Sequence, residues 1–218
     1  MILAGEPYEM LMASLPAIGL LSEKAPPINA ARLAERLKLL SEDDWAEMEV
    51  IRSILGWAHI DIGNDDAAFL ERLGRVLAQV RSPDLRAALS ERMEIRTTVA
   101  ALRRRHAGLE APGPGEPWGW GRHVERIRAN WGQPDFGLAR TYPWIVAAKE
   151  RLERGDSAGL ERLVLEAAWR SIDRHAFGHE FDFEAVALYV ARWSLADRWS
   201  RYDAEAAAAR FAELLEAA

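Results

Sequence analysis

The stretch FDFEAVALYVARWSLADRW, residues 181–199, decides the fold class. Its apolar side chains surround more than one face of a helix, as expected when neighbouring elements cover that helix on several sides. Asp182 precedes the apolar run, and its carboxylate is suited to accept hydrogen bonds from the first free backbone N–H groups. The pattern therefore predicts a buried helix from Phe183 to about Arg201.

Helical signals continue along most of the chain, whereas strand-like alternation is almost absent. The clearest start is Ser82-Pro83, because serine can cap the free amides and proline at the first helical position has no amide hydrogen to leave unpaired. The expected helical ranges are 28–40, 41–57, 66–77, 83–105, 124–131, 143–154, 157–175, 183–201 and 204–217. With residues 8–21 expected to form a short strand or extended arm, we predict an all-α multi-helix bundle with a short extended N-terminal arm.

Glycine and proline are concentrated in GLEAPGPGEPWGWG, residues 108–121, where a helix cannot persist. This loop or linker separates an N-terminal helical half, residues 1–107, from a C-terminal helical half, residues 122–218, although both halves could form one continuous domain. One pattern of residues is repeated in the two halves at an offset of 112 residues: Glu49, Trp57, Ile60 and Asp61 recur as Glu161, Trp169, Ile172 and Asp173. The repeated pattern indicates either a duplicated helical unit or a coincidence in a helical, tryptophan-rich chain.

Composition excludes several classes of function. The 218 residues include 28 basic and 34 acidic side chains, for a net charge of −6, so nucleic acid is a poor default partner. There is no cysteine, hence no disulfide, thiolate zinc site or cysteine nucleophile. Residues 10–22, the longest uncharged stretch, are too few to cross a bilayer, and no cationic signal segment opens the chain. We expect a soluble, folded protein.

One segment combines histidines with carboxylates. His175 and His179 are four residues apart, which on a helix would place both imidazoles on one face, with Asp182 or Asp173 as a third metal ligand. A divalent metal held there would support hydrolysis. Gly178 lies between the histidines and favours a turn, so the alternative is a solvated interhelical turn in which an aspartate caps the next helix.

Motifs for other chemistry are missing from the sequence. Neither a G-x-S-x-G elbow nor a phosphate-binding G-x-x-x-x-G-K-[ST] loop occurs, and Ser194 and Ser200 are expected to bond back to their own helix. We therefore predict a non-enzymatic protein with no catalytic residue, cofactor, bound metal or small-molecule substrate.

Arginines are the charged residues most informative about partner binding. Arg92, Arg96 and Arg103 fall on one face of the 83–105 helix, with Arg104 and Arg105 beside them, and such a stripe suits bidentate pairing with carboxylates of another protein. The alternative is a solvated face neutralised within the chain by Glu91 and Glu94. Because tryptophan and arginine dominate binding hot spots, the candidate partner-binding residues are Arg92, Arg96, Arg103, Arg104, Trp193, Arg198 and Trp199.

Several motifs together resemble a bacterial protein family whose genes lie in operons for V/A-type rotary ATPases. They are YEMLMASLP at residues 8–16, PPI at 26–28, AALRRR at 100–105, YPW at 142–144 and the 181–199 stretch. The resemblance covers most of the chain in order and is weakest over residues 108–121. Where the family has L-R-N, this chain has Ile95-Arg96-Thr97 and lacks the amide.

The family resembles the C (eukaryotic d) subunit in the position that it would occupy in the complex. That subunit is an all-helical funnel that connects the central shaft of a rotary ATPase to the membrane ring of proteolipid subunits. The resemblance thus implies a non-catalytic coupling subunit or assembly factor, cytoplasmic and peripheral to the membrane, with the shaft and proteolipid-ring subunits as partners. The alternatives are a metal-dependent hydrolase using His175, His179 and Asp182, and a cytosolic helical adaptor unrelated to an ATPase.

Overall fold

The computed structural model describes residues 6–19, 25–56 and 66–216. Within these ranges the chain forms nine helices and no strand, which confirms the predicted all-α bundle. The helices are α1 (Glu6–Ser14), α2 (Ala30–Leu37), α3 (Glu42–Gly56), α4 (Asp66–Leu77), α5 (Pro83–His106), α6 (Val124–Ala129), α7 (Ile145–Glu153), α8 (Ser157–His175) and α9 (Phe183–Glu216).

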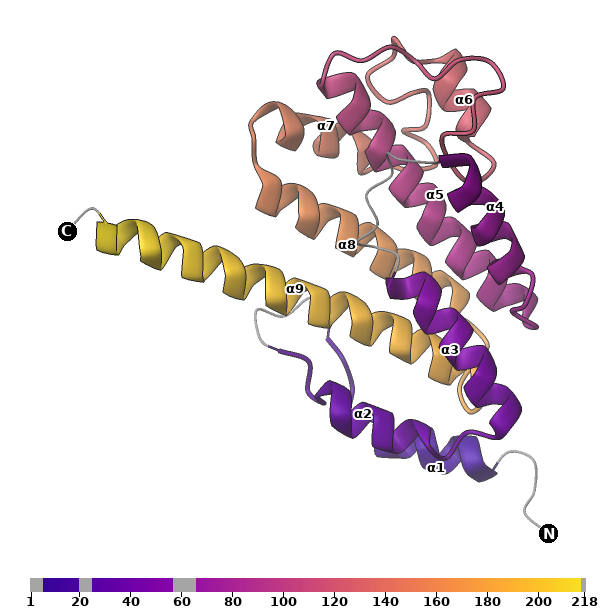
Figure 1. Cartoon of the computed structure of the whole chain (residues 1–218). Coiled ribbons are helices and arrows are strands. Elements are labelled where there is room, and N and C mark those ends of the chain that lie inside the picture. The colour runs from indigo at the N-terminus through magenta and orange to yellow at the C-terminus, as the bar shows by residue number, and fades with distance from the viewer. Residues whose placement is uncertain (1–5, 20–24, 57–65, 217–218) are drawn as a thin grey trace.

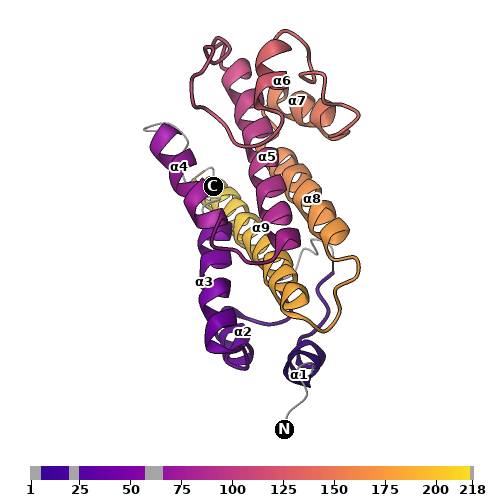
Figure 2. The same ribbon diagram turned by 90° about the vertical axis from the view of Figure 1, so that its right-hand side faces the viewer.

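The centre of the bundle is the layer formed by α5, α8 and α9 (Figure 1). Helix α5 packs against α8, and α8 packs against α9, while α3 closes the far side of α9. The shorter α6 and α7 lie at one end of α5, and α1 and α2 lie near the other end of the body (Figure 2). One hydrophobic cluster runs from Leu11 to Trp199, so helices from both halves of the sequence contribute to the same core.

The predicted helix starts are confirmed by their capping bonds. The Ser82 hydroxyl accepts the N–H of Leu85 at 3.4 Å, as expected before Pro83. The Asp182 carboxylate accepts the N–H of Ala185 at 2.8 Å and begins α9. These side chains satisfy backbone donors that have no partner within their own helices.

The expectation of an extended N-terminal arm was wrong, because residues 6–14 form helix α1. This helix lies against α9 and α2, buries Leu11 almost completely, and brings the Tyr8 hydroxyl to the carboxylate of Asp44. Its short sequence shows little helical periodicity of its own. Tertiary packing therefore determines its conformation.

The two predicted C-terminal helices are also one in the structure, where α9 continues from Phe183 to Glu216 and its end projects beyond α8 (Figure 1). The break was expected between Arg201 and Ala204. No glycine or proline supports a break between residues 200 and 216, and the alanine-rich sequence there favours helix.

The glycine- and proline-rich segment is a loop, as predicted, and it is tied to α5. Trp120 donates its backbone N–H to the Thr97 hydroxyl at 2.8 Å, and Arg122 donates its N–H to buried Glu94 at 3.0 Å. Gly121 lies at φ +99°, and a Cβ at this position would overlap the Glu94 side chain. Only glycine combines this backbone conformation with so close an approach.

Two further sequence predictions concern an internal repeat and membrane-spanning segments. The proposed repeat depends on Trp57, Ile60 and Asp61, which lie outside the described residues; their counterparts Trp169 and Ile172 are buried in the core. Across the part of the chain that the structure describes, we find no helix with both the length and the apolar character that a membrane span requires.

Candidate functional site

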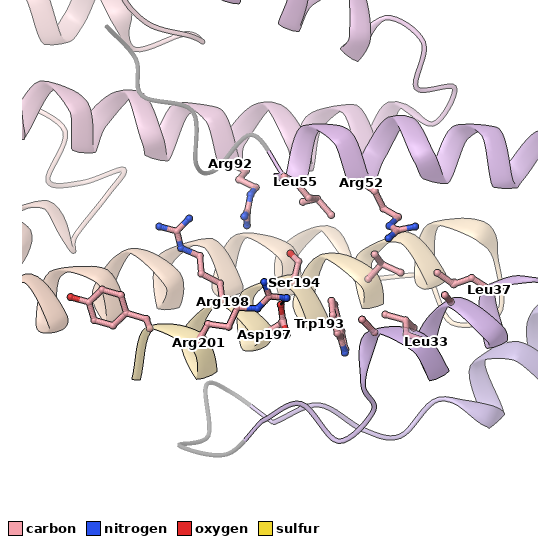
Figure 3. A pocket seen from close by; sticks show the side chains of 15 residues that line it. Leu33, Leu37, Arg52, Leu55, Arg92, Trp193, Ser194, Asp197, Arg198 and Arg201 are labelled. Atoms are coloured by element: carbon pink, nitrogen blue, oxygen red, sulfur yellow. Dashed lines mark ion pairs between the residues drawn. The ribbon is translucent and has the colours of Figure 1, made fainter. Parts of the chain in front are cut away.

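A cleft of about 540 Å³ opens between α2, α3, α5 and α9 (Figure 3). Arginines from three helices line it: Arg52 from α3, Arg92 from α5, and Arg198 and Arg201 from α9. Apolar side chains of α2 and α3, among them Leu33 and Leu55, line the cleft as well. Among the lining residues that the structure describes, Asp197 is the one carboxylate, and it pairs with Arg201 at 2.7 Å.

Arg92 points from α5 into this cleft (Figure 3). Its Nη1 atom is buried and has no hydrogen-bond partner among the described residues, although the residue as a whole keeps some solvent exposure. Burial, together with the like charges of Arg96 and Arg198, lowers the pKa of Arg92 to about 10. The guanidinium is therefore a charged group at neutral pH that its own chain solvates poorly.

The predicted arginine stripe exists along α5. Burial lowers the pKa of Arg96 to about 10, with contributions from Arg198 and Arg103, so these side chains lie near enough to repel one another. Arg103 is exposed near the end of the helix. Arg198 reaches the stripe from α9 and pairs with Glu161 of α8. We call Arg92, Arg96, Arg103 and Arg198 the arginine stripe.

Glu91 and Glu94, the two carboxylates expected to neutralise this stripe, bind other groups instead. Glu91 accepts hydrogen bonds from Ser171 and Arg174, at 2.6 Å each, and bonds to His175 at 3.1 Å. The hydrogen bond with His175 is the largest cause that lowers the pKa of Glu91 to about 2. Glu94 instead accepts the Tyr142 hydroxyl at 3.0 Å and the N–H of Arg122.

The other candidate partner-binding residues serve the fold. Arg104 donates to the carbonyl of Glu110 at 2.9 Å and thereby holds the loop that follows α5. Trp193 lines the cleft and donates its indole N–H to the Ile28 carbonyl at 2.7 Å, which fixes its ring. Trp199 lies in the core at 7% exposure and stacks on Tyr202, so its ring is not on the surface.

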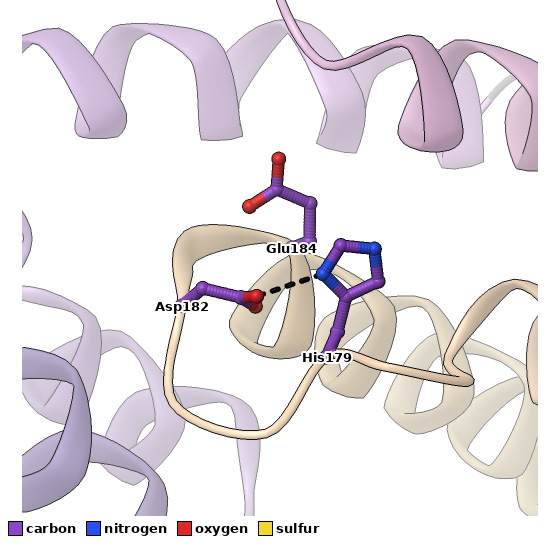
Figure 4. Close-up of side chains that lie close together, drawn as sticks. All are labelled: His179, Asp182 and Glu184. Atoms are coloured by element: carbon purple, nitrogen blue, oxygen red, sulfur yellow. Dashed lines mark hydrogen bonds and ion pairs between the residues drawn. The ribbon is translucent and has the colours of Figure 1, made fainter.

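The histidine cluster is arranged differently from the predicted metal site. His179 bonds through Nδ1 to Asp182 at 2.7 Å (Figure 4). Through Nε2 it also bonds to Asp84 at 3.3 Å. Ligand atoms of His179, Asp182 and Glu184 lie within 4.8 Å of one another, so these three residues could hold a metal ion.

The predicted pairing of the two histidines as ligands was wrong. His175 turns to Glu91, and Asp173 pairs with Arg192 at 2.8 Å. The hydrogen bond with Asp182 raises the pKa of His179, and a protonated imidazole does not bind metal. Asp182 also caps α9, so the segment matches the alternative prediction of an interhelical turn with a capping aspartate.

Ser194 and Ser200 bond back to their own helix as predicted, to the carbonyls of Ala191 at 2.7 Å and Asp197 at 2.9 Å. Two residues of the cleft were missed by sequence reasoning, Arg52 and Arg201. Arg201 follows Arg198 by three positions, and this helical spacing was a usable signal. Arg52 comes from a helix far away in sequence, and nothing local relates it to the cleft.

Comparison with known proteins does not identify a relative. No protein-family profile, curated protein or solved structure matches the chain. The resemblance to the rotary-ATPase operon family therefore rests on the sequence motifs themselves.

Proposed function

We propose that this protein is a non-catalytic subunit or assembly factor of a bacterial V/A-type rotary ATPase, and that it couples the central shaft to the membrane proteolipid ring. The motif resemblance supplies the identity of the complex. The arginine stripe supplies the contact, since carboxylates of a shaft subunit could pair with it.

The observation that carries this proposal is the convergence of cations on α5 and α9. Arg92 and Arg96 have lowered pKa values because burial and neighbouring arginines disfavour their charges. Glu91 and Glu94 are bound to other groups, and the buried Nη1 of Arg92 has no acceptor among the described residues. An anionic partner that reached Arg92 would relieve the cost of burying its charge.

Arginine suits this role better than lysine because its planar guanidinium binds a carboxylate through two parallel hydrogen bonds. Exposed Arg103 would steer an acidic partner toward the stripe, whereas half-buried Arg96 would hold it after docking. In this proposal the protein is cytoplasmic and reaches the membrane surface through its protein partners.

The test is co-purification from native membranes with a C-terminally tagged copy, followed by identification of the bound proteins by mass spectrometry. We expect catalytic, shaft or proteolipid subunits of the rotary ATPase in the eluate. The proposal is falsified if none is recovered from a preparation in which the intact ATPase is shown to be present, and a cytosolic adaptor would then explain the fold better.

A matched pair of charge reversals locates the contact. Arg103→Glu changes an exposed residue of the stripe, and Arg75→Glu changes an exposed residue of α4 by the same charge. We expect the first to lower the recovery of ATPase subunits and the second to leave it unchanged. Equal recovery for both variants and the wild type would remove the stripe from the interface.

A second candidate function, metal-dependent hydrolysis, is favoured by one observation, the close approach of His179, Asp182 and Glu184. Its test is metal analysis of protein purified without an affinity tag. About one equivalent of a divalent metal per chain would support it.

A further inference from the structure

We propose that the cleft between α2, α3, α5 and α9 binds a small organic anion that has a phosphate or carboxylate head group and an apolar or aromatic body. This ligand is a different molecule from the protein partners proposed above and does not require them, although Arg92 and Arg198 belong to both the cleft and the arginine stripe. Arginine and apolar side chains of the cleft would each contribute one part of the recognition (Figure 3).

The head group would bind at Arg92. Its Nη1 is enclosed by protein and finds no acceptor among the residues described, and it points into the cleft. Arg52, Arg198 and Arg201 also line the cleft, but they are paired with Glu49, Glu161 and Asp197, respectively. Arg92 has no such ion pair among the described residues, so its guanidinium gives the cleft its preference for an anion.

An oxyanion suits this place because a guanidinium donates two parallel hydrogen bonds to carboxylate or phosphate oxygens. The second cavity that Arg92 borders, of about 20 Å³, is lined mainly by core side chains such as Leu85, Leu89 and Ile172. The chain therefore offers the guanidinium apolar surroundings on one side and the open cleft on the other. An anion that enters the cleft supplies the missing acceptor.

The body of the ligand would lie against the apolar surface of the cleft. Leu33 and Leu37 of α2 face Leu55 of α3 across it, and Trp193 presents a ring that its bond to the Ile28 carbonyl holds in place. A largely apolar surface with a few convergent polar groups is typical of small-molecule sites. The volume of about 540 Å³ falls within their usual range, roughly 300–1,000 Å³.

Isothermal titration calorimetry on the full chain tests the proposal with three probes. Phenyl phosphate and benzoate carry both parts of the ligand and differ in their head groups, and benzyl alcohol carries the body alone. We expect saturable 1:1 binding of one or both anions and no binding of benzyl alcohol. The anion that binds with the higher affinity identifies whether the head group is phosphate or carboxylate.

Two variants assign the binding to the cleft. Arg92→Met keeps the unbranched apolar stem and removes the guanidinium. It should weaken binding roughly 10- to 100-fold, because a hydrogen bond to a charged group is lost. Trp193→Leu should weaken phenyl phosphate more than inorganic phosphate, since only the first has a body to contact the ring. Arg75→Met, outside the cleft, should change neither.

The proposal is overturned if neither anion binds to folded wild-type protein, or if Arg92→Met leaves the affinity unchanged in a variant whose helical circular dichroism is intact. It is also overturned if an acidic peptide binds the cleft more tightly than both probes and displaces them, because the occupant would then be a protein. Co-purification with the Trp193→Leu protein distinguishes a failure of this proposal from a failure of the proposed function. The proposed function does not depend on Trp193, so this variant should still recover ATPase subunits.

Discussion

Replacing Arg92 by methionine should stabilise the isolated protein, although it removes a charged side chain. Most substitutions at buried positions destabilise, so the direction of this change is diagnostic. Arg92 carries a charge that burial and two neighbouring arginines disfavour, and its Nη1 has no acceptor among the described residues. Methionine matches the arginine side chain out to about Nε, so the apolar contacts of the side-chain stem remain.

The magnitude follows from the lowered pKa. A pKa of about 10 for Arg92 corresponds, at about 1.36 kcal/mol per unit, to roughly 3 kcal/mol of disfavoured charge. Substituting buried ionic groups by apolar ones gains roughly 1–4 kcal/mol in other proteins. We expect the free energy of unfolding to rise by about 1–3 kcal/mol, and the melting temperature by roughly 5 °C for a chain of this size.

The pH dependence gives a second check on the cause. The folded-state pKa of Arg92 lies below its unfolded value, so the wild type regains the lost stability only as the pH rises through about 10. The difference between variant and wild type should therefore stay constant from about pH 6 to about pH 9.

Urea denaturation measures the free energy of unfolding and scanning calorimetry measures the melting temperature, both without added anions. Arg103→Met is the control, because Arg103 is exposed on the same helix and its loss should change the stability by less than about 0.5 kcal/mol. Destabilisation by Arg92→Met of more than about 1 kcal/mol would refute the reasoning, since the guanidinium would then have a stabilising partner.

Three further predictions concern the loop, the histidine turn and metal. Gly121→Ala should destabilise by at least about 2 kcal/mol in urea denaturation, because its Cβ overlaps buried Glu94, whereas Gly115→Ala, also at positive φ but in open space, should cost about 1 kcal/mol. The pKa of His179 is raised beside Asp182, so the contribution of His179 to stability is complete below its unfolded pKa and disappears as the pH rises through its folded pKa. His179→Gln should therefore lower the melting temperature more at about pH 5.5 than at about pH 8.5. An equal decrease at both pH values would contradict this role of the His179–Asp182 hydrogen bond. Metal analysis of untagged protein should find less than about a tenth of an equivalent of divalent metal per chain, because protonation of His179 and capping by Asp182 oppose coordination.

Local signals in the sequence were sufficient for the helices that begin with a capping side chain. Ser82 and Asp182 satisfy backbone donors within their own turn, so their effect can be read without knowing the fold. Helix α1 could not be predicted in this way, because it depends on burying Leu11 against distant helices. The continuity of α9 was missed because the apolar pattern of residues 181–199 ends near Arg201, although no glycine or proline interrupts the helix there.

The candidate site shows the same division. Helical spacing correctly placed Arg92, Arg96 and Arg103 on one face of α5. It could not show which groups neutralise them, since the partners of Glu91 come from α8, about 80 residues later. The cleft requires Arg52 and Arg201 from two other helices, and only the tertiary arrangement brings them to Arg92.

Photo-crosslinking in native membranes tests the central claim most directly. A photoreactive phenylalanine derivative at position 103 reports what touches the arginine stripe, and the same group at position 75 on α4 serves as the control. We predict an adduct with a shaft subunit of the rotary ATPase from position 103 and none from position 75. An intact ATPase in the same membranes without any adduct at position 103 would contradict the proposed docking.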